Sequence, residues 1–163
     1  MKTVGVVAFA FGAPKTIRSN RRIAKIAFKN ARKFNGLVYT QLDICVDEGI
    51  PVEYTKEEPG NPPPTLRIAR GAVQWAKRNR LTKLLVVAAE PHLWRALRDV
   101  RQAVREDGVR IEVRVCEEIE QYPKDSWFCL DSTQERVRSW KAWNKREIIL
   151  QLMPFFFYKL VAS

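Results

Sequence analysis

Two segments of the chain are apolar on both faces of an extended strand, residues 4–11 (VGVVAFAF) and residues 84–89 (LLVVAA). A strand with one solvated face alternates apolar and polar residues, whereas a strand covered on both faces is a continuous apolar run. Gly12-Ala13-Pro14 follows the first run and Glu90-Pro91 the second, so both are too short for helices. They predict two central strands of a parallel sheet with helices on each face.

The segments between and after these runs alternate between strand and helix patterns. Shorter strands are expected at residues 37–40, 50–54 and 111–115, the second near an edge because it contains Pro51. Helices are expected from caps at Ser19 and Thr65, from about His92, and from about Ser132. This order predicts a three-layer, Rossmann-like α/β fold: a doubly wound, mainly parallel sheet of about five strands with helices on both faces.

The chain's length of 163 residues suits one domain, with an apolar C-terminal helix at 133–162 packing on it and Pro154 ending or kinking that helix. The apolar stretch 148–162 is too short and too interrupted to span a membrane, and residues 1–13 make a poor export signal. Three scattered cysteines indicate a reducing compartment, so a cytoplasmic location is expected. The single histidine excludes a multi-histidine metal site, and no metal site is predicted.

The charge is strongly positive and unevenly distributed. Lys and Arg number 29 against 18 Asp and Glu, for a net charge of +11. Residues 1–42 contain nine basic residues and no acid, and residues 61–110 contain eleven basic and four acidic ones. An anionic partner is one explanation, and the solvated faces of basic helices are another.

Three loops should meet beyond the carboxyl ends of the strands, where doubly wound sheets bind ligands. These loops are residues 12–22, 57–65 and 88–95. The first contains neither of the glycine-rich phosphate-binding motifs, but it offers Gly12 and Arg18 near a helix N-terminus, where an anion is favoured. An ordinary basic first helical turn explains the same residues.

The third loop carries the pattern with the most chemistry. His92 and Arg95 lie three residues apart at the start of a helix that follows a buried strand, so they share one helix face. An imidazole and a guanidinium there could polarise a carboxylate or phosphate, or histidine could act as a general acid or base. The alternative is a locally packed histidine beside a surface arginine.

The segment 84–96 resembles the YdcF/SanA/ElyC-like family (domain of unknown function 218), in which a buried strand leads into a His-[Met/Leu]-x-Arg-Ala helix. Gly49-Ile50-Pro51, Glu58 and Thr65 resemble the family's upstream strand, its acidic residue and its helix-opening threonine. The family's Glu-Asn pair after that threonine is replaced here by Leu66 and Arg67. The resemblance implies a nucleotide-like ligand or S-adenosylmethionine, and a link of some members to the cell envelope.

These observations favour a site for a small anionic or nucleotide-like ligand, either S-adenosylmethionine or a phosphorylated or sugar-nucleotide metabolite. We expect His92, Arg95 and Glu58 in catalytic roles and Gly12, Arg18, Thr65 and Glu90 in ligand binding. Whether the protein is an enzyme stays open; a hydrolase or transferase acting on a phosphorylated or glycosylated metabolite is the enzymatic version. The cofactor stays open, with S-adenosylmethionine and a nucleotide as the candidates.

Two further partners stay open at this point. The first is nucleic acid, which the positive blocks 1–42 and 61–110 could bind, with Trp75, Trp94, Trp140 and Trp143 stacking on bases unless they are buried. The second is a second copy of the chain or a membrane surface, either of which an exposed Phe155–Tyr158 segment would contact.

Overall fold

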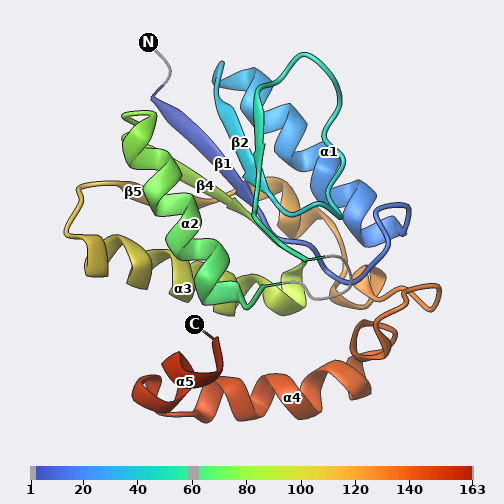
Figure 1. Cartoon of the computed structure of the whole chain (residues 1–163). Helices are drawn as coiled ribbons and strands as arrows, with labels where there is room; N and C mark the ends of the chain where they lie inside the picture. Colours follow the sequence, from blue (N-terminus) through green and yellow to red (C-terminus); the bar gives the residue numbers. More distant parts are fainter. Residues whose placement is uncertain (1–2, 59–62, 163) are drawn as a thin grey trace.

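The computed structural model describes residues 3–58 and 63–162 and contains one five-stranded sheet (Figure 1). All its strands are parallel, in the order β3-β2-β1-β4-β5. The strands are β1 (Val4–Ala8), β2 (Leu37–Thr40), β3 (Val52–Tyr54), β4 (Lys83–Val87) and β5 (Glu112–Val115). This confirms the predicted three-layer, Rossmann-like α/β fold, with the two doubly apolar runs at its centre.

Helices cover both faces of the sheet. Helix α1 (Arg18–Lys33) packs on one face, and α2 (Thr65–Arg78) and α3 (Glu90–Asp107) pack side by side on the other. Alternate residues of β1 point to opposite cores, with Val6 in the α1 core and Val7 in the α2–α3 core. The chain therefore has two apolar layers separated by the sheet, as a doubly wound fold requires.

The two central strands end earlier than their apolar runs. The last sheet contact of the first run is from Phe9, whose backbone N–H donates to the carbonyl of Val87 at 2.9 Å. Phe11 then leaves the sheet, and its N–H donates to the Asn20 side chain at 2.9 Å. The apolar residues beyond the strands are still buried because they line the end of the sheet, which periodicity alone does not distinguish from strand.

The two predicted helix caps are wrong. Helix α1 begins at Arg18, and the Ser19 hydroxyl donates to the carbonyl of Phe11 at 3.0 Å. Thr65 is the first residue of α2, after Pro64 in the cap position, and its hydroxyl contacts α3. In both cases a buried tertiary partner takes the hydroxyl that a local cap would have used.

The C-terminal third departs most from expectation. After β5 the chain forms three short 3-10 turns, Glu117–Gln121, Lys124–Trp127 and Glu135–Val137. Only then come α4 (Trp140–Leu152) and α5 (Phe155–Ala162), so a single helix over 133–162 beginning near Ser132 is wrong. Ser139 caps α4 by accepting from the N–H of Ala142 at 3.3 Å, and Pro154 separates the two helices.

Helices α4 and α5 lie across the strand ends, next to α2 and α3 (Figure 1). A small apolar cluster of Leu66 with Leu150, Tyr158 and Ala162 joins them to α2. The Tyr158 hydroxyl donates to the carboxylate of Asp99 on α3, and burial followed by that carboxylate raises the pKa of Tyr158 to about 12. Within the described ranges, no helix has the length and apolar character needed to cross a bilayer.

Candidate functional site

A cavity of about 440 Å³ lies beyond the carboxyl ends of the central strands. Its walls come from the loops after β1 and β2 and from the first turns of α2 and α3. The remaining wall comes from residues 116–162, which we call the covering segment and which include the covering helices α4 and α5. The strand order reverses between β1 and β4, and the cavity is lined by the loop after β1 and by the start of α3, the helix that follows β4. This is the place where a doubly wound sheet binds its ligand.

The cavity brings together four of the seven predicted site residues. Gly12 lines it from the loop after β1, Thr65 from the start of α2, and His92 and Arg95 from the first turns of α3. The expected convergence of the three loops is therefore present.

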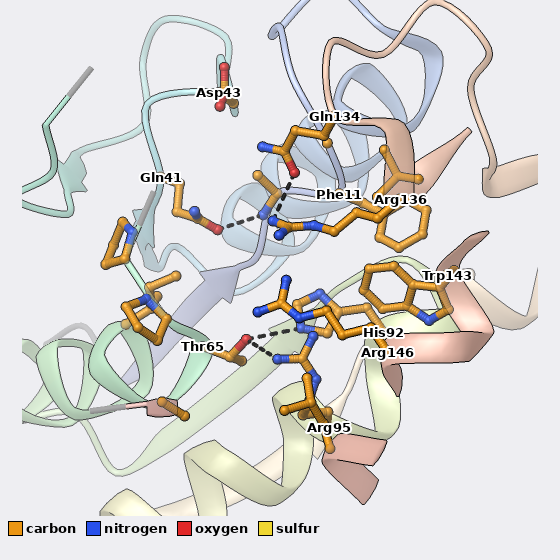
Figure 2. Close-up of a pocket in the computed structure, with 18 of the residues that line it drawn as sticks. Phe11, Gln41, Asp43, Thr65, His92, Arg95, Gln134, Arg136, Trp143 and Arg146 are labelled. Carbon is orange, nitrogen blue, oxygen red and sulfur yellow. Dashed lines mark hydrogen bonds between the residues drawn. The ribbon is translucent and has the colours of Figure 1, made fainter. Parts of the chain in front are cut away.

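Thr65, His92 and Arg95 form a buried hydrogen-bonded group at the base of the cavity (Figure 2). Arg95 Nη1 donates to Thr65 Oγ1 at 2.8 Å, and the same oxygen lies 3.3 Å from His92 Nε2. A threonine hydroxyl that accepts from arginine keeps its own proton to donate, so this arrangement suits an unprotonated Nε2. The other ring nitrogen, Nδ1, is buried without a hydrogen-bond partner among the described residues.

The charge of Arg95 is balanced by a carboxylate from the covering segment. Its Nε lies 3.1 and 3.2 Å from the two carboxylate oxygens of Glu147 on α4, and both side chains are buried. The indole of Trp143, one turn earlier on α4, donates through Nε1 to the carbonyl of Pro91 at 3.2 Å. The covering helix is thus attached to α3 by an ion pair and a hydrogen bond.

Two further arginines face the cavity with no carboxylate partner within the described chain. Arg136 donates only to the side-chain oxygen of Gln134, at 2.9 Å, and Arg146 has no hydrogen-bond or ion-pair partner there. Figure 2 shows both guanidinium groups pointing into the space beside His92, while Asp43 lies apart from them. Burial, then repulsion from Arg146 and Arg95, lowers the pKa of Arg136 to about 10. The cavity therefore carries an uncompensated positive charge.

His92 is neutral in this environment. Burial, followed by the positive charges of Arg95, Arg136 and Arg146, lowers its pKa well below the usual 6.5. A neutral imidazole can accept a proton or donate a hydrogen bond at neutral pH, whereas an imidazolium could only donate.

We expect this burial to make the protein less stable in mild acid. Because the folded-state pKa of His92 is lowered, the unfolded chain binds more protons below pH 6.5, so the free energy of unfolding falls as the pH decreases. The slope from one such group is at most about 1.4 kcal/mol per pH unit. Urea unfolding across this range should show a smaller pH slope for His92→Gln than for the wild type. Equal slopes for the two proteins would contradict a buried neutral histidine.

Three predicted site residues lie outside the cavity. Glu58 is exposed, and Arg18 donates to the carbonyl of Phe128 at 3.0 Å. Glu90 is the first residue of α3, and its carboxylate lies 3.6 Å from Lys124 Nζ. None of the three is among the residues that line the cavity. Arg18 instead contacts the segment of 3-10 turns that follows β5. The position of that segment was not predicted.

Sequence reasoning missed the polar residues of the other walls. Gln41 follows β2 directly, so the rule that ligands bind at strand ends could have found it; its amide oxygen accepts from the N–H of Ala10 at 2.9 Å. Glu147 had a weaker signal, since it lies between Trp143 and Leu150 at helical spacing and thus places a charge on an apolar stripe. Arg136 and Arg146 had no signal of their own.

Other chemistry finds little support in the described ranges. No group of three or more His, Cys, Asp or Glu side chains in them could hold a metal ion. Burial raises the pKa of Cys116 to about 12, which leaves that thiol unreactive. Two of the four tryptophans considered for base stacking, Trp75 and Trp143, are buried.

Comparison of the sequence with known protein families finds no matching family, and comparison with curated proteins finds no match either.

Proposed function

We propose that the protein binds a small anionic ligand, carrying a phosphate-like group, in the cavity beyond β1, β2 and β4. The observation that carries the proposal is the pair Arg136 and Arg146, which share the cavity without a carboxylate partner in the described chain. Like charges held together in a partly buried site are unfavourable, and a bound dianion would compensate them both. Their guanidinium groups also match the geometry of phosphate oxygens.

The backbone adds to this positive potential. The first turns of α2 and α3 both border the cavity, and neither helix has a side-chain hydrogen bond at its cap. The helix dipole favours an anion at such positions. In α3 the dipole acts without free N–H groups at the second and third residues, because Pro91 has none and the N–H of His92 donates to the carbonyl of Ala89 at 2.8 Å. These dipoles act together with the arginines, while the carboxylate of Asp43 lines another part of the cavity, apart from them.

The remaining walls suggest what the anion is attached to. Gln41 and Gln134 offer hydrogen-bonding groups, and Phe11 and Trp143 offer aromatic surface. A volume of about 440 Å³ lies within the range of small-molecule sites. The cavity thus suits a nucleotide-like or sugar-phosphate-like ligand. The resemblance of residues 84–96 to the YdcF/SanA/ElyC-like family supports a nucleotide-like ligand. S-adenosylmethionine, which the resemblance also implies, has no phosphate and carries a sulfonium cation, so the arginine pair favours the phosphorylated ligands over it.

The enzymatic form of the proposal uses His92. With Nε2 facing the Thr65 hydroxyl, Nδ1 of the neutral ring carries the proton and can donate a hydrogen bond to a substrate oxygen during hydrolysis or transfer on a phosphorylated or glycosylated metabolite. Binding alone requires only the arginines, so substrate binding and turnover are separable. A His92→Gln variant that keeps ligand affinity but loses turnover would identify the catalytic role.

Arg136→Met/Arg146→Met tests the binding site directly. Isothermal titration with inorganic phosphate, adenosine monophosphate, uridine diphosphate glucose and S-adenosylmethionine should give at least one ligand whose affinity falls about tenfold or more in the double variant. The ligand-free double variant should be slightly more stable than the wild type, because the repulsion between the arginines is removed. These two effects have opposite signs, so a general folding defect cannot imitate them.

Arg18→Met is the matched control, because it removes an arginine that contacts the carbonyl of Phe128 and does not line the cavity. It should leave the affinity unchanged. The site assignment is overturned if the double variant binds every phosphate ligand as tightly as the wild type, or if Arg18→Met causes the same loss.

A further inference from the structure

The outer surface of α4 and α5 carries seven large apolar side chains that no other part of the described chain covers. Their exposed fractions lie between 45% and 79%. They are Ile148, Ile149 and Leu152 on α4 and Phe156, Phe157, Leu160 and Val161 on α5, and we call them the C-terminal apolar face. Isolated exposed apolar residues are ordinary, but a contiguous set of this kind indicates an interaction surface.

The charges beside this face are positive. One side of α4 carries Lys141, Lys145, Ile148 and Leu152. Consecutive members of this set are four, three and four residues apart, which is the spacing of neighbours on one helix face. Within α4 and α5 the single acidic residue is Glu147, and it is buried against Arg95. The exposed surface of the two helices is therefore apolar and basic, with no exposed carboxylate.

We propose that the C-terminal apolar face docks on an anionic lipid bilayer. A helix surface that combines aromatic and aliphatic side chains with lysines lies in the plane of a membrane interface, with its apolar side chains at the boundary between headgroups and acyl chains. Lys141 and Lys145 would then contact lipid phosphates, since their long side chains reach the headgroup layer.

Charge favours a lipid surface over a second copy of the chain. A symmetric dimer through this face would bring Lys141 and Lys145 of both copies near one interface, in a protein whose net charge is +11. An anionic bilayer meets the same surface with opposite charge. Val161 belongs both to the C-terminal apolar face and to the lining of the cavity, so docking would place the cavity beside the headgroups.

Co-sedimentation with vesicles tests this docking. The wild type should bind vesicles containing one third phosphatidylglycerol in phosphatidylcholine at least about tenfold more tightly than pure phosphatidylcholine vesicles, and added salt should weaken the binding. Leu152→Glu/Phe156→Glu should abolish binding because it places charges on the apolar face. Lys141→Glu/Lys145→Glu should weaken binding to the anionic vesicles about tenfold or more.

Leu130→Glu is the matched control, since it replaces an 83% exposed leucine that is not part of the C-terminal apolar face. It should bind like the wild type, and circular dichroism should show that every variant is folded. The proposal is overturned if the wild type fails to bind anionic vesicles, or if Leu152→Glu/Phe156→Glu binds them unchanged. It is equally overturned if light scattering shows a dimer that this variant converts to a monomer. The phosphate titrations are independent of all these outcomes.

Discussion

Glu147→Ala is expected to lower the free energy of unfolding by about 3 to 5 kcal/mol. The carboxylate accepts from Arg95 in a site where the two side chains are only 10% and 5% exposed, so its removal leaves a buried guanidinium without a counter-charge. Thr65 would be the remaining hydrogen-bond partner of Arg95 and cannot neutralise it. Denaturant unfolding, monitored by circular dichroism, measures the loss.

Two variants separate the unpaired charge from simple loss of packing. Arg95→Met/Glu147→Leu removes both charges and should be markedly more stable than Glu147→Ala, because replacing a buried ion pair by apolar side chains is often neutral. Lys145→Ala removes an exposed charge from the same helix and should change stability by less than about 0.5 kcal/mol. If the double variant is as unstable as Glu147→Ala, the destabilisation does not arise from an unpaired Arg95.

Gly12→Ala is the second change with a large expected effect. Gly12 has a φ of +92°, and a Cβ there would lie 2.5 Å from Cγ2 of Val137 and 2.6 Å from Oγ of Ser132. Ser132 cannot easily give way, because its hydroxyl donates to the carbonyl of Ala13 at 3.1 Å. We expect a loss of about 3 to 4 kcal/mol, from backbone strain and overpacking together.

Gly49→Ala provides the comparison for this prediction. Gly49 has nearly the same φ, +93°, but no atom lies within 4 Å of the position of its Cβ. It should lose only the strain component, about 1 to 2 kcal/mol. The difference between the two variants in the free energy of unfolding, from thermal or urea unfolding, then measures the steric cost of a Cβ placed between the β1 loop and the covering segment. Equal losses of stability would mean that Val137 and Ser132 can move away from the Cβ without cost.

The sheet was predictable because its central strands are apolar on both faces. The runs at 4–11 and 84–89 placed β1 and β4 in the middle, and Pro51 correctly indicated an edge strand. The ends of these strands were less accurate, since Phe11 remains buried after the chain has left the ladder. An apolar pattern reports burial, and burial extends beyond hydrogen bonding between strands.

The site was predictable only where it follows from the sheet. His92, Arg95, Thr65 and Gly12 were found because parallel strands end at one edge, whichever side chains they carry. The covering segment follows no such rule: residues 116–139 form short 3-10 turns without a sustained period. Arg136 and Arg146 reach the cavity, and Glu147 reaches Arg95, through long-range packing, which a local pattern does not encode.

The covering segment also determines when the cavity can exist. The strands, with α1 to α3, are complete by Val115, whereas Arg136, Trp143, Arg146 and Glu147 all follow. Without those later residues the strand ends would be an open, solvated edge. Closure brings three guanidinium groups together, and a bound anion would screen them. A ligand that binds only the closed form would stabilise it, by an amount that grows with the ligand concentration relative to its Kd.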